Sequence, residues 1–209
     1  MNKIPVQEQG KEHNGELAVS LSRRLDFVST VESVVTRALK TSANKMGLGN
    51  VKTLIARMKE GDSVAFNYYN YNIVKQLGEV LGFWDKNIRA VYAHDCDGAT
   101  PEEGCFENAS PFSLVHMIIW TERKTKALNA LVETIDRAMV QHHRHMLGRI
   151  KLEHVLDVQV IDDEDVRNRT GYGALLQSIC QPPIQVWRSA LIPAGSAEFK
   201  HKKRDRKTE

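Results

Sequence analysis

Residues 111–165 constrain the fold of this chain most, because they have the pattern of a strand, a long helix and a second strand. Residues 112–120 (FSLVHMIIW) are apolar at nearly every position, as in a strand that is buried on both faces. Residues 124–147 carry apolar side chains at helical spacing, and residues 155–161 (VLDVQVI) form a second apolar run. A helix that links two such strands predicts a parallel β-α-β unit.

The stretches on either side of this unit extend the same pattern. Helical spacing predicts three earlier helices, over residues 17–40, over residues 51–60, and from residue 62 or 63 to about Gly82. Short apolar runs predict strands at 87–93 and 184–188, with a helical segment between residues 167 and 179. We therefore predict an α/β fold. The fold has a small mixed or parallel sheet of about four strands and an N-terminal helical layer. After the N-terminal helices, the elements follow along the chain in the order β-β-α-β-α-β.

The length of 209 residues suits a single domain, which we place at residues 17–193, with a helical part (17–85) and a sheet part (86–193). The polar segments 1–16 and 194–209 are expected to be disordered tails. No apolar run approaches the ~20 residues that a membrane-spanning helix needs, so no membrane association is expected. The three cysteines are too few for a disulfide framework and favour a cytoplasmic location.

The net charge of +3 comes from the C-terminal tail alone, because residues 1–193 hold equal numbers of basic and acidic side chains. A nucleic acid or an acidic partner could contact this tail through charge. The candidate polyanion-binding residues are Lys200, Lys202, Lys203, Arg204, Arg206 and Lys207.

The polar connection after the first predicted strand is the first candidate for metal binding. Its imidazole and thiol groups suit Zn²⁺, and its carboxylates suit a harder divalent cation. A fourth zinc ligand and a Cys-x-x-Cys pair are missing, and a solvated acidic loop is the competing interpretation. The candidate ligands are His94, Asp95, Cys96, Asp97 and Cys105.

Asp162 and Asp163, at the carboxyl end of the central strand, are the second candidate, since ligands of parallel sheets bind at such ends. Acidic residues also cap helices, which explains the same pair without a ligand. The two candidates form one site only if the first two strands run parallel. A simple hairpin places His94 at the opposite end of the sheet.

Histidines elsewhere have simpler interpretations. His116 lies within an apolar strand, where a hydrogen-bonded core histidine is expected. His142, His143 and His145 lie near the end of the long helix, where we expect solvated side chains that interact favourably with the helix dipole.

Three hypotheses for function follow. The first is a binding or assembly module that self-associates. The second is a metal-dependent hydrolase or transferase that uses the acidic residues at the strand ends, with a divalent metal as its cofactor. The third is a nucleic-acid-associated protein that works through its tail. The sequence contains no serine elbow, Walker sequence or dinucleotide fingerprint, and does not decide whether the protein is an enzyme.

The expectation of self-association rests on the first predicted helix. Leu21, Val28, Val31 and Val35 lie close to one stripe of the helix over residues 17–40, and further leucines widen this apolar surface. Such a surface exceeds what one helical layer over a four-strand sheet requires, and a symmetric partner would cover it. We therefore predict a homodimer with this helix in the contact.

Overall fold

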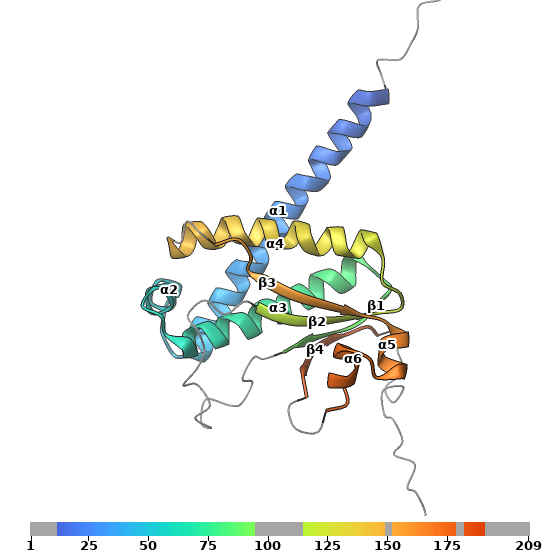
Figure 1. Cartoon of the computed structure of the whole chain (residues 1–209). Helices are drawn as coiled ribbons and strands as arrows, with labels where there is room; N and C mark the ends of the chain where they lie inside the picture. The colour runs from blue at the N-terminus through green and yellow to red at the C-terminus, as the bar shows by residue number, and fades with distance from the viewer. Residues whose placement is uncertain (1–11, 95–114, 149–151, 179–181, 191–209) are drawn as a thin grey trace, which may run out of the picture.

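The computed structural model describes residues 12–94, 115–148, 152–178 and 182–190. Three helices occupy the chain up to Trp84, and the strands of the sheet follow from Ile88 onward (Figure 1). The elements in chain order are α1 (Glu12–Lys45), α2 (Val51–Lys59), α3 (Ser63–Trp84), β1 (Ile88–Ala93), β2 (Val115–Thr121), α4 (Lys126–Leu147), β3 (Leu156–Ile161), α5 (Asp163–Asn168), α6 (Tyr172–Leu175) and β4 (Ile184–Arg188).

The four strands form one mixed sheet in the order β3-β2-β1-β4. Strands β2 and β3 are parallel, with Val115 opposite Leu156 and Trp120 opposite Ile161, and α4 connects them. The predicted parallel β-α-β unit is therefore confirmed, as is the small mixed α/β sheet with its N-terminal helices. Strand β1 pairs antiparallel with both β2 and β4.

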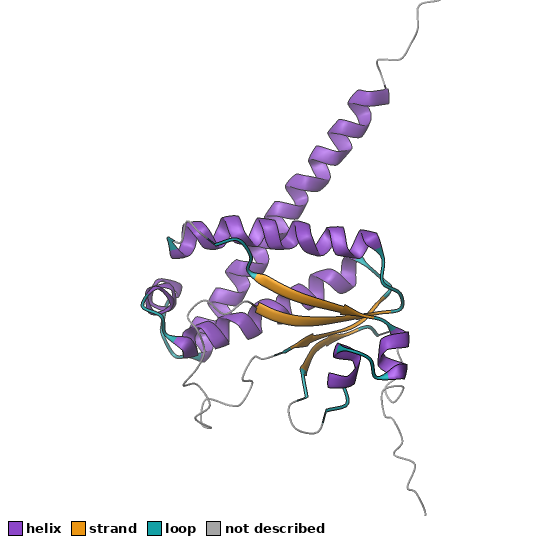
Figure 2. Ribbon diagram, in the orientation of Figure 1, coloured by secondary structure: helices purple, strands orange, loops and turns teal. Residues whose placement is uncertain are grey.

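The long helices α1, α3 and α4 lie on one side of the sheet, and the short α5 and α6 lie on the other (Figure 2). Alternate residues of each strand therefore enter two different clusters. On the long-helix side, Val91, Met117 and Ile119 pack against the three helices. On the other side, Ala90, Tyr92 and Ile118 pack against α5 and α6 in a smaller cluster.

Capping side chains fix where the helices begin. Asn50 caps α2, Asp62 caps α3 (of the two alternatives, 62 and 63, for its start), and Thr125 caps α4 by accepting a hydrogen bond from the Leu128 amide. Helix α4 ends at Leu147, and the following Gly148 has a left-handed φ of 70°, which suits glycine at this position. Helix α1 begins at Glu12 rather than near Leu17, so residues 12–16, which we expected to belong to a disordered tail, are helical.

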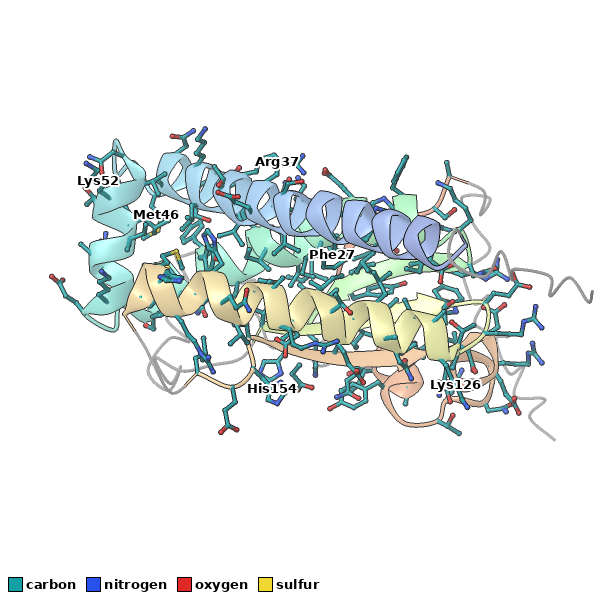
Figure 3. All side chains as sticks on the ribbon, turned by 90° about the horizontal axis from the view of Figure 1, so that it is seen from above. Phe27, Arg37, Met46, Lys52, Lys126 and His154 are labelled. Atoms are coloured by element: carbon teal, nitrogen blue, oxygen red, sulfur yellow. The ribbon has the colours of Figure 1, made fainter. Side chains whose placement is uncertain are left out.

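Helix α1 packs against the body of the protein from about Phe27 onward. Val31, Val34, Val35 and Ala38 are buried against the other helices, while the N-terminal half extends away from them (Figure 1). Seen from above, α1 runs beside α4 (Figure 3). Among the described residues no helix, α1 included, is long and apolar enough to span a bilayer.

Two glycines of α3 make room for the edge strand β4. A Cβ at Gly78 would lie 2.8 Å from the Trp187 Cβ, and a Cβ at Gly82 would overlap the Trp187 indole ring. The ring of Trp187 therefore occupies a notch that only glycine leaves open. This contact packs α3 against β4, the strand at one edge of the sheet.

We expect Gly82→Ala to lower the free energy of unfolding by about 1–3 kcal/mol, because the added methyl group displaces Trp187. The sign is informative, since alanine at an exposed helix position would instead stabilise by up to about 1 kcal/mol. Urea denaturation measures the change. Lys75→Ala, at an exposed position of the same helix, is the control and should stay within ~0.5 kcal/mol of the parent. A Gly82→Ala variant more stable than its parent contradicts the notch.

Candidate functional site

The acidic residues after β3 are engaged in structural contacts. Asp162 caps α5, with Oδ1 accepting hydrogen bonds from the amides of Glu164 and Asp165. The Asp165 carboxylate returns the contact by accepting from the Asp162 amide, and it also pairs with Lys124 at 2.6 Å. This hydrogen bond from Lys124 holds the pKa of Asp165 below its ordinary value. The capping interpretation therefore accounts for Asp162.

Asp163 has a different set of partners on the sheet. Arg89 of β1 donates two hydrogen bonds to it, from Nε at 3.0 Å and from a terminal nitrogen at 2.7 Å. Trp120 of β2 donates its indole N–H to Oδ1 at 2.9 Å. The hydrogen bond to Asp163 raises the pKa of Arg89. This network attaches α5 to two strands, so both oxygens of Asp163 already accept strong donors.

The combined metal site that joined His94 to Asp162 and Asp163 does not form. It required parallel first strands, but β1 and β2 are antiparallel, with Ile88 opposite Thr121 and Ala93 opposite Met117. His94 therefore follows β1 at the end of the sheet where β2 and β3 begin, whereas Asp162 and Asp163 follow the other end of β3.

The remaining predicted site residues lie outside the described part of the chain. This holds for Asp95, Cys96, Asp97 and Cys105, and for the basic residues from Lys200 to Lys207. Within the described ranges, no group of three or more His, Cys, Asp or Glu side chains is arranged to hold a metal ion.

One end of the sheet face under α5 and α6 carries a row of polar side chains that spans three strands. The β1–β2 register continues from Ala93 and Met117 to His94 and His116, and the His94 amide donates to the His116 carbonyl at 3.2 Å. On the other side of β2, His116 is paired with Asp157 of β3. Residues directly opposite on neighbouring strands point to the same face. We call His94, His116 and Asp157 the polar row.

Hydrogen bonds hold two members of the polar row, His116 and Asp157, in place. His116 Nδ1 lies 2.9 Å from Asp157 Oδ2, and the Gln159 amide donates to Asp157 Oδ1 at 3.0 Å. Since a carboxylate only accepts, Nδ1 of His116 carries the proton, and in the neutral ring Nε2 keeps its lone pair. The side chains of His116 and Asp157 are 30% and 34% exposed, so both are within reach of solvent.

The third member, His94, contacts the short helix that covers this face. Its ring meets the ring of Tyr172 in α6 edge to face, with the centroids 5.9 Å apart. Tyr172 also packs against the cluster of Ala90, Tyr92 and Ile118. His94 therefore lies on the same side of the sheet as Tyr92, where the alternation along β1 places it.

A second pair, between α3 and α4, is fully enclosed. His143 is 4% exposed, so the expectation that all three histidines of this group are solvated is wrong for it. Its Nδ1 donates to the Met139 carbonyl at 2.8 Å, and its Nε2 accepts from the Tyr69 hydroxyl at 2.9 Å. Burial lowers the pKa of His143 to about 4 and raises that of Tyr69. This pair is a core contact without access for a ligand.

A buried carboxylate of α4 holds the beginning of β3. Asp136 Oδ1 accepts hydrogen bonds from the amides of Val155 and Leu156 at 2.8 and 2.9 Å. Its Oδ2 accepts from Nδ1 of His154 at 2.7 Å, and this contact raises the pKa of His154. The His154 side chain is 69% exposed, whereas Asp136 is buried. The arrangement connects the helix to the strand that follows it.

The polar row has a signal in the sequence, in the alternation of residues 155–161. In residues 155–161, Leu156, Val158 and Val160 occupy one face, which leaves Asp157 and Gln159 on the other. The opposite face of this edge strand is therefore polar, and the parallel register makes His116 the neighbour of Asp157.

Comparisons of the chain with family models, curated proteins and solved structures find no match.

Proposed function

We propose that this protein is an assembly module that forms a homodimer through the N-terminal half of α1. The observation that supports the proposal is the position of this half, which extends beyond the body while the second half of α1 buries one face against the other helices (Figure 1). The proposed setting is the cytoplasm, which the small number of cysteines supports.

The length and pattern of this arm, residues 12–28, argue for a partner. A helical segment of this size has marginal stability in water unless an apolar stripe packs against something. Leu17, Leu21, Leu25 and Val28 follow one another at spacings of three or four residues, which places them along one side of a helix. A second copy offers the same stripe, so a two-fold symmetric contact covers both.

The charges in the arm favour an antiparallel dimer. In a parallel pair, Arg24 lies against its own copy, and the two like charges repel. In an antiparallel pair centred on Leu21, Arg24 lies opposite Ala18, and Leu17 lies opposite Leu25.

The base of the arm offers further apolar surface. Phe27 of α1 stacks on Trp84 at the end of α3, with ring centroids 4.9 Å apart. The preceding residue, Phe83, is 73% exposed, and Lys86 lies 5.1 Å from its ring centroid. Solitary exposed apolar residues are ordinary, but one beside the base of a projecting helix can extend the contact that the helix begins.

We expect Leu21→Asp to convert the dimer to a monomer at micromolar concentration. Antiparallel pairing would bring the two new carboxylates together at its centre, which weakens association by roughly 100-fold or more. Light scattering coupled to size-exclusion chromatography measures the mass, and circular dichroism checks that the fold is intact. Ser22→Asp adds the same charge one residue away from the stripe and should leave the dimer in place.

Two outcomes contradict the proposal. A parent protein that remains monomeric throughout the micromolar range has no dimer to explain. A dimer that withstands both Leu21→Asp and Val28→Asp with an intact fold uses another surface.

A further inference from the structure

We propose that His94 and His116 bind a borderline transition-metal ion such as Zn²⁺, Ni²⁺ or Cu²⁺, with Asp157 as the positioning residue for His116. The two histidines are directly opposite each other on antiparallel strands and point to the same face. The Cβ atoms of such a pair lie ~4.5–5.5 Å apart, so two imidazole rings can reach one ion between them.

The hydrogen bonds of the polar row already give His116 the tautomer and the ring orientation that a metal ligand needs. His116 donates its Nδ1–H as a hydrogen bond to Asp157, which leaves the Nε2 lone pair to coordinate a metal ion. Histidines that bind metals usually donate their other N–H to a carboxylate or carbonyl, which fixes the ring and increases its basicity. Gln159 holds Asp157 in turn, so the orienting carboxylate is itself oriented.

The donor set determines the class of ion. Imidazole nitrogen suits zinc, nickel and copper, whereas Mg²⁺ and Ca²⁺ require oxygen ligands. Two protein ligands leave the remaining coordination positions to water or to a small bound ligand, one protein ligand fewer than in open catalytic zinc sites.

His154 provides a matched comparison within the same chain. Like His116, it contacts a carboxylate through Nδ1, at 2.7 Å from Asp136, and its side chain is even more exposed. It precedes β3 and binds the carboxylate of α4, outside the β1–β2 pairing that places His94 opposite His116. A second imidazole opposite the first is therefore the feature that separates the proposed site from an ordinary His–Asp contact.

Calorimetric titration with Zn²⁺ tests the proposal in a full-length parent whose three cysteines are replaced by serine, so that no thiolate competes. We expect one binding event that His116→Ala abolishes and that His94→Ala weakens at least 10-fold. Asp157→Asn should weaken it by ~10–100-fold, because the ring loses its carboxylate partner while both imidazoles remain. His154→Ala, the matched control, should bind as the parent does.

Histidine ring NMR of the same samples identifies the ligands directly, since Zn²⁺ should shift the ¹⁵N resonances of His94 and His116 before those of the other six histidines. Thermal unfolding shows whether each variant is folded, and Asp157→Asn tests the site if His116→Ala does not fold. The proposal is wrong if the parent binds no Zn²⁺, or if folded His94→Ala and Asp157→Asn proteins bind it as tightly as the parent does.

Discussion

Asp136→Ala is expected to lower the free energy of unfolding by about 3–5 kcal/mol. The carboxylate accepts hydrogen bonds from the amides of Val155 and Leu156 and from His154, and it is buried in α4. Its removal leaves the two backbone amides without their acceptor, and each buried unsatisfied donor costs about 1–3 kcal/mol. A domain of this size has a total stability of only about 5–15 kcal/mol, so the variant loses a large part of it.

Urea denaturation with two companion variants separates the causes of this loss. Asp136→Asn keeps an oxygen for the two amides and loses the charge that faces His154, so it should cost less than half as much as Asp136→Ala. Glu133→Ala removes a carboxylate from an exposed position of the same helix and should stay within ~0.5 kcal/mol of the parent. An Asp136→Ala protein within 1 kcal/mol of the parent would show that β3 begins correctly without the carboxylate.

The elements with strong local patterns could be predicted from the sequence. Residues 112–120 are apolar at nearly every position, and apolar and polar residues alternate within 155–161. The helix between these two segments has a wide apolar face. The parallel pairing of β2 and β3 follows, because a crossover helix leaves few other topologies. Asp62 as a helix cap was equally accessible, since a cap acts within a few residues of its own position.

Contacts between distant segments could not be predicted in the same way. The direction of β1 relative to β2 depends on the connection over residues 95–114, whose composition permits either topology. His143 is buried because Tyr69, far away in the sequence, supplies a hydrogen-bond partner in the core. The sequence around His143 contains nothing that identifies Tyr69 as its partner, and the reverse is also true. A histidine near a helix end is normally solvated.

In the candidate site, too, the local features could be predicted from the sequence, whereas the contacts between distant segments could not. Asp162 and Asp163 form a pair of carboxylates at the end of a strand, but helix capping and the contact with Arg89 account for them. His116 was expected to make a hydrogen bond in the core, and its partner proved to be Asp157 at a half-exposed position. Only the register of three strands places His94 beside these two residues, and register is a property of the folded sheet.

Acidification from neutral pH to pH 4 is expected to lower the free energy of unfolding by about 3 kcal/mol through His143 alone. Burial lowers the pKa of this imidazole to about 4 in the folded protein, against 6.5 in the unfolded chain. Between these values the unfolded chain binds a proton that the folded protein does not, so stability falls as the pH falls. Protonation would also give Nε2 a hydrogen and remove the acceptor of the Tyr69 hydroxyl.

Other groups titrate near His143 and must be separated from it. The pKa of His142 is also lowered by burial, so its contribution has the same sign. His154 has the opposite effect, because Asp136 raises its pKa and the stability that it provides is lost as the pH rises. The difference between the parent and His143→Gln isolates the buried ring, since both proteins share the other groups.

His143→Gln keeps a donor for the Met139 carbonyl and an acceptor for the Tyr69 hydroxyl but cannot be protonated in this range. We expect it to be less stable than the parent at pH 7 and to lose most of the difference by pH 4.5. Urea denaturation at half-unit steps of pH measures both curves. Parallel curves between pH 6.5 and pH 4 would mean that His143 titrates alike in the folded and unfolded states, which its enclosure between α3 and α4 should prevent.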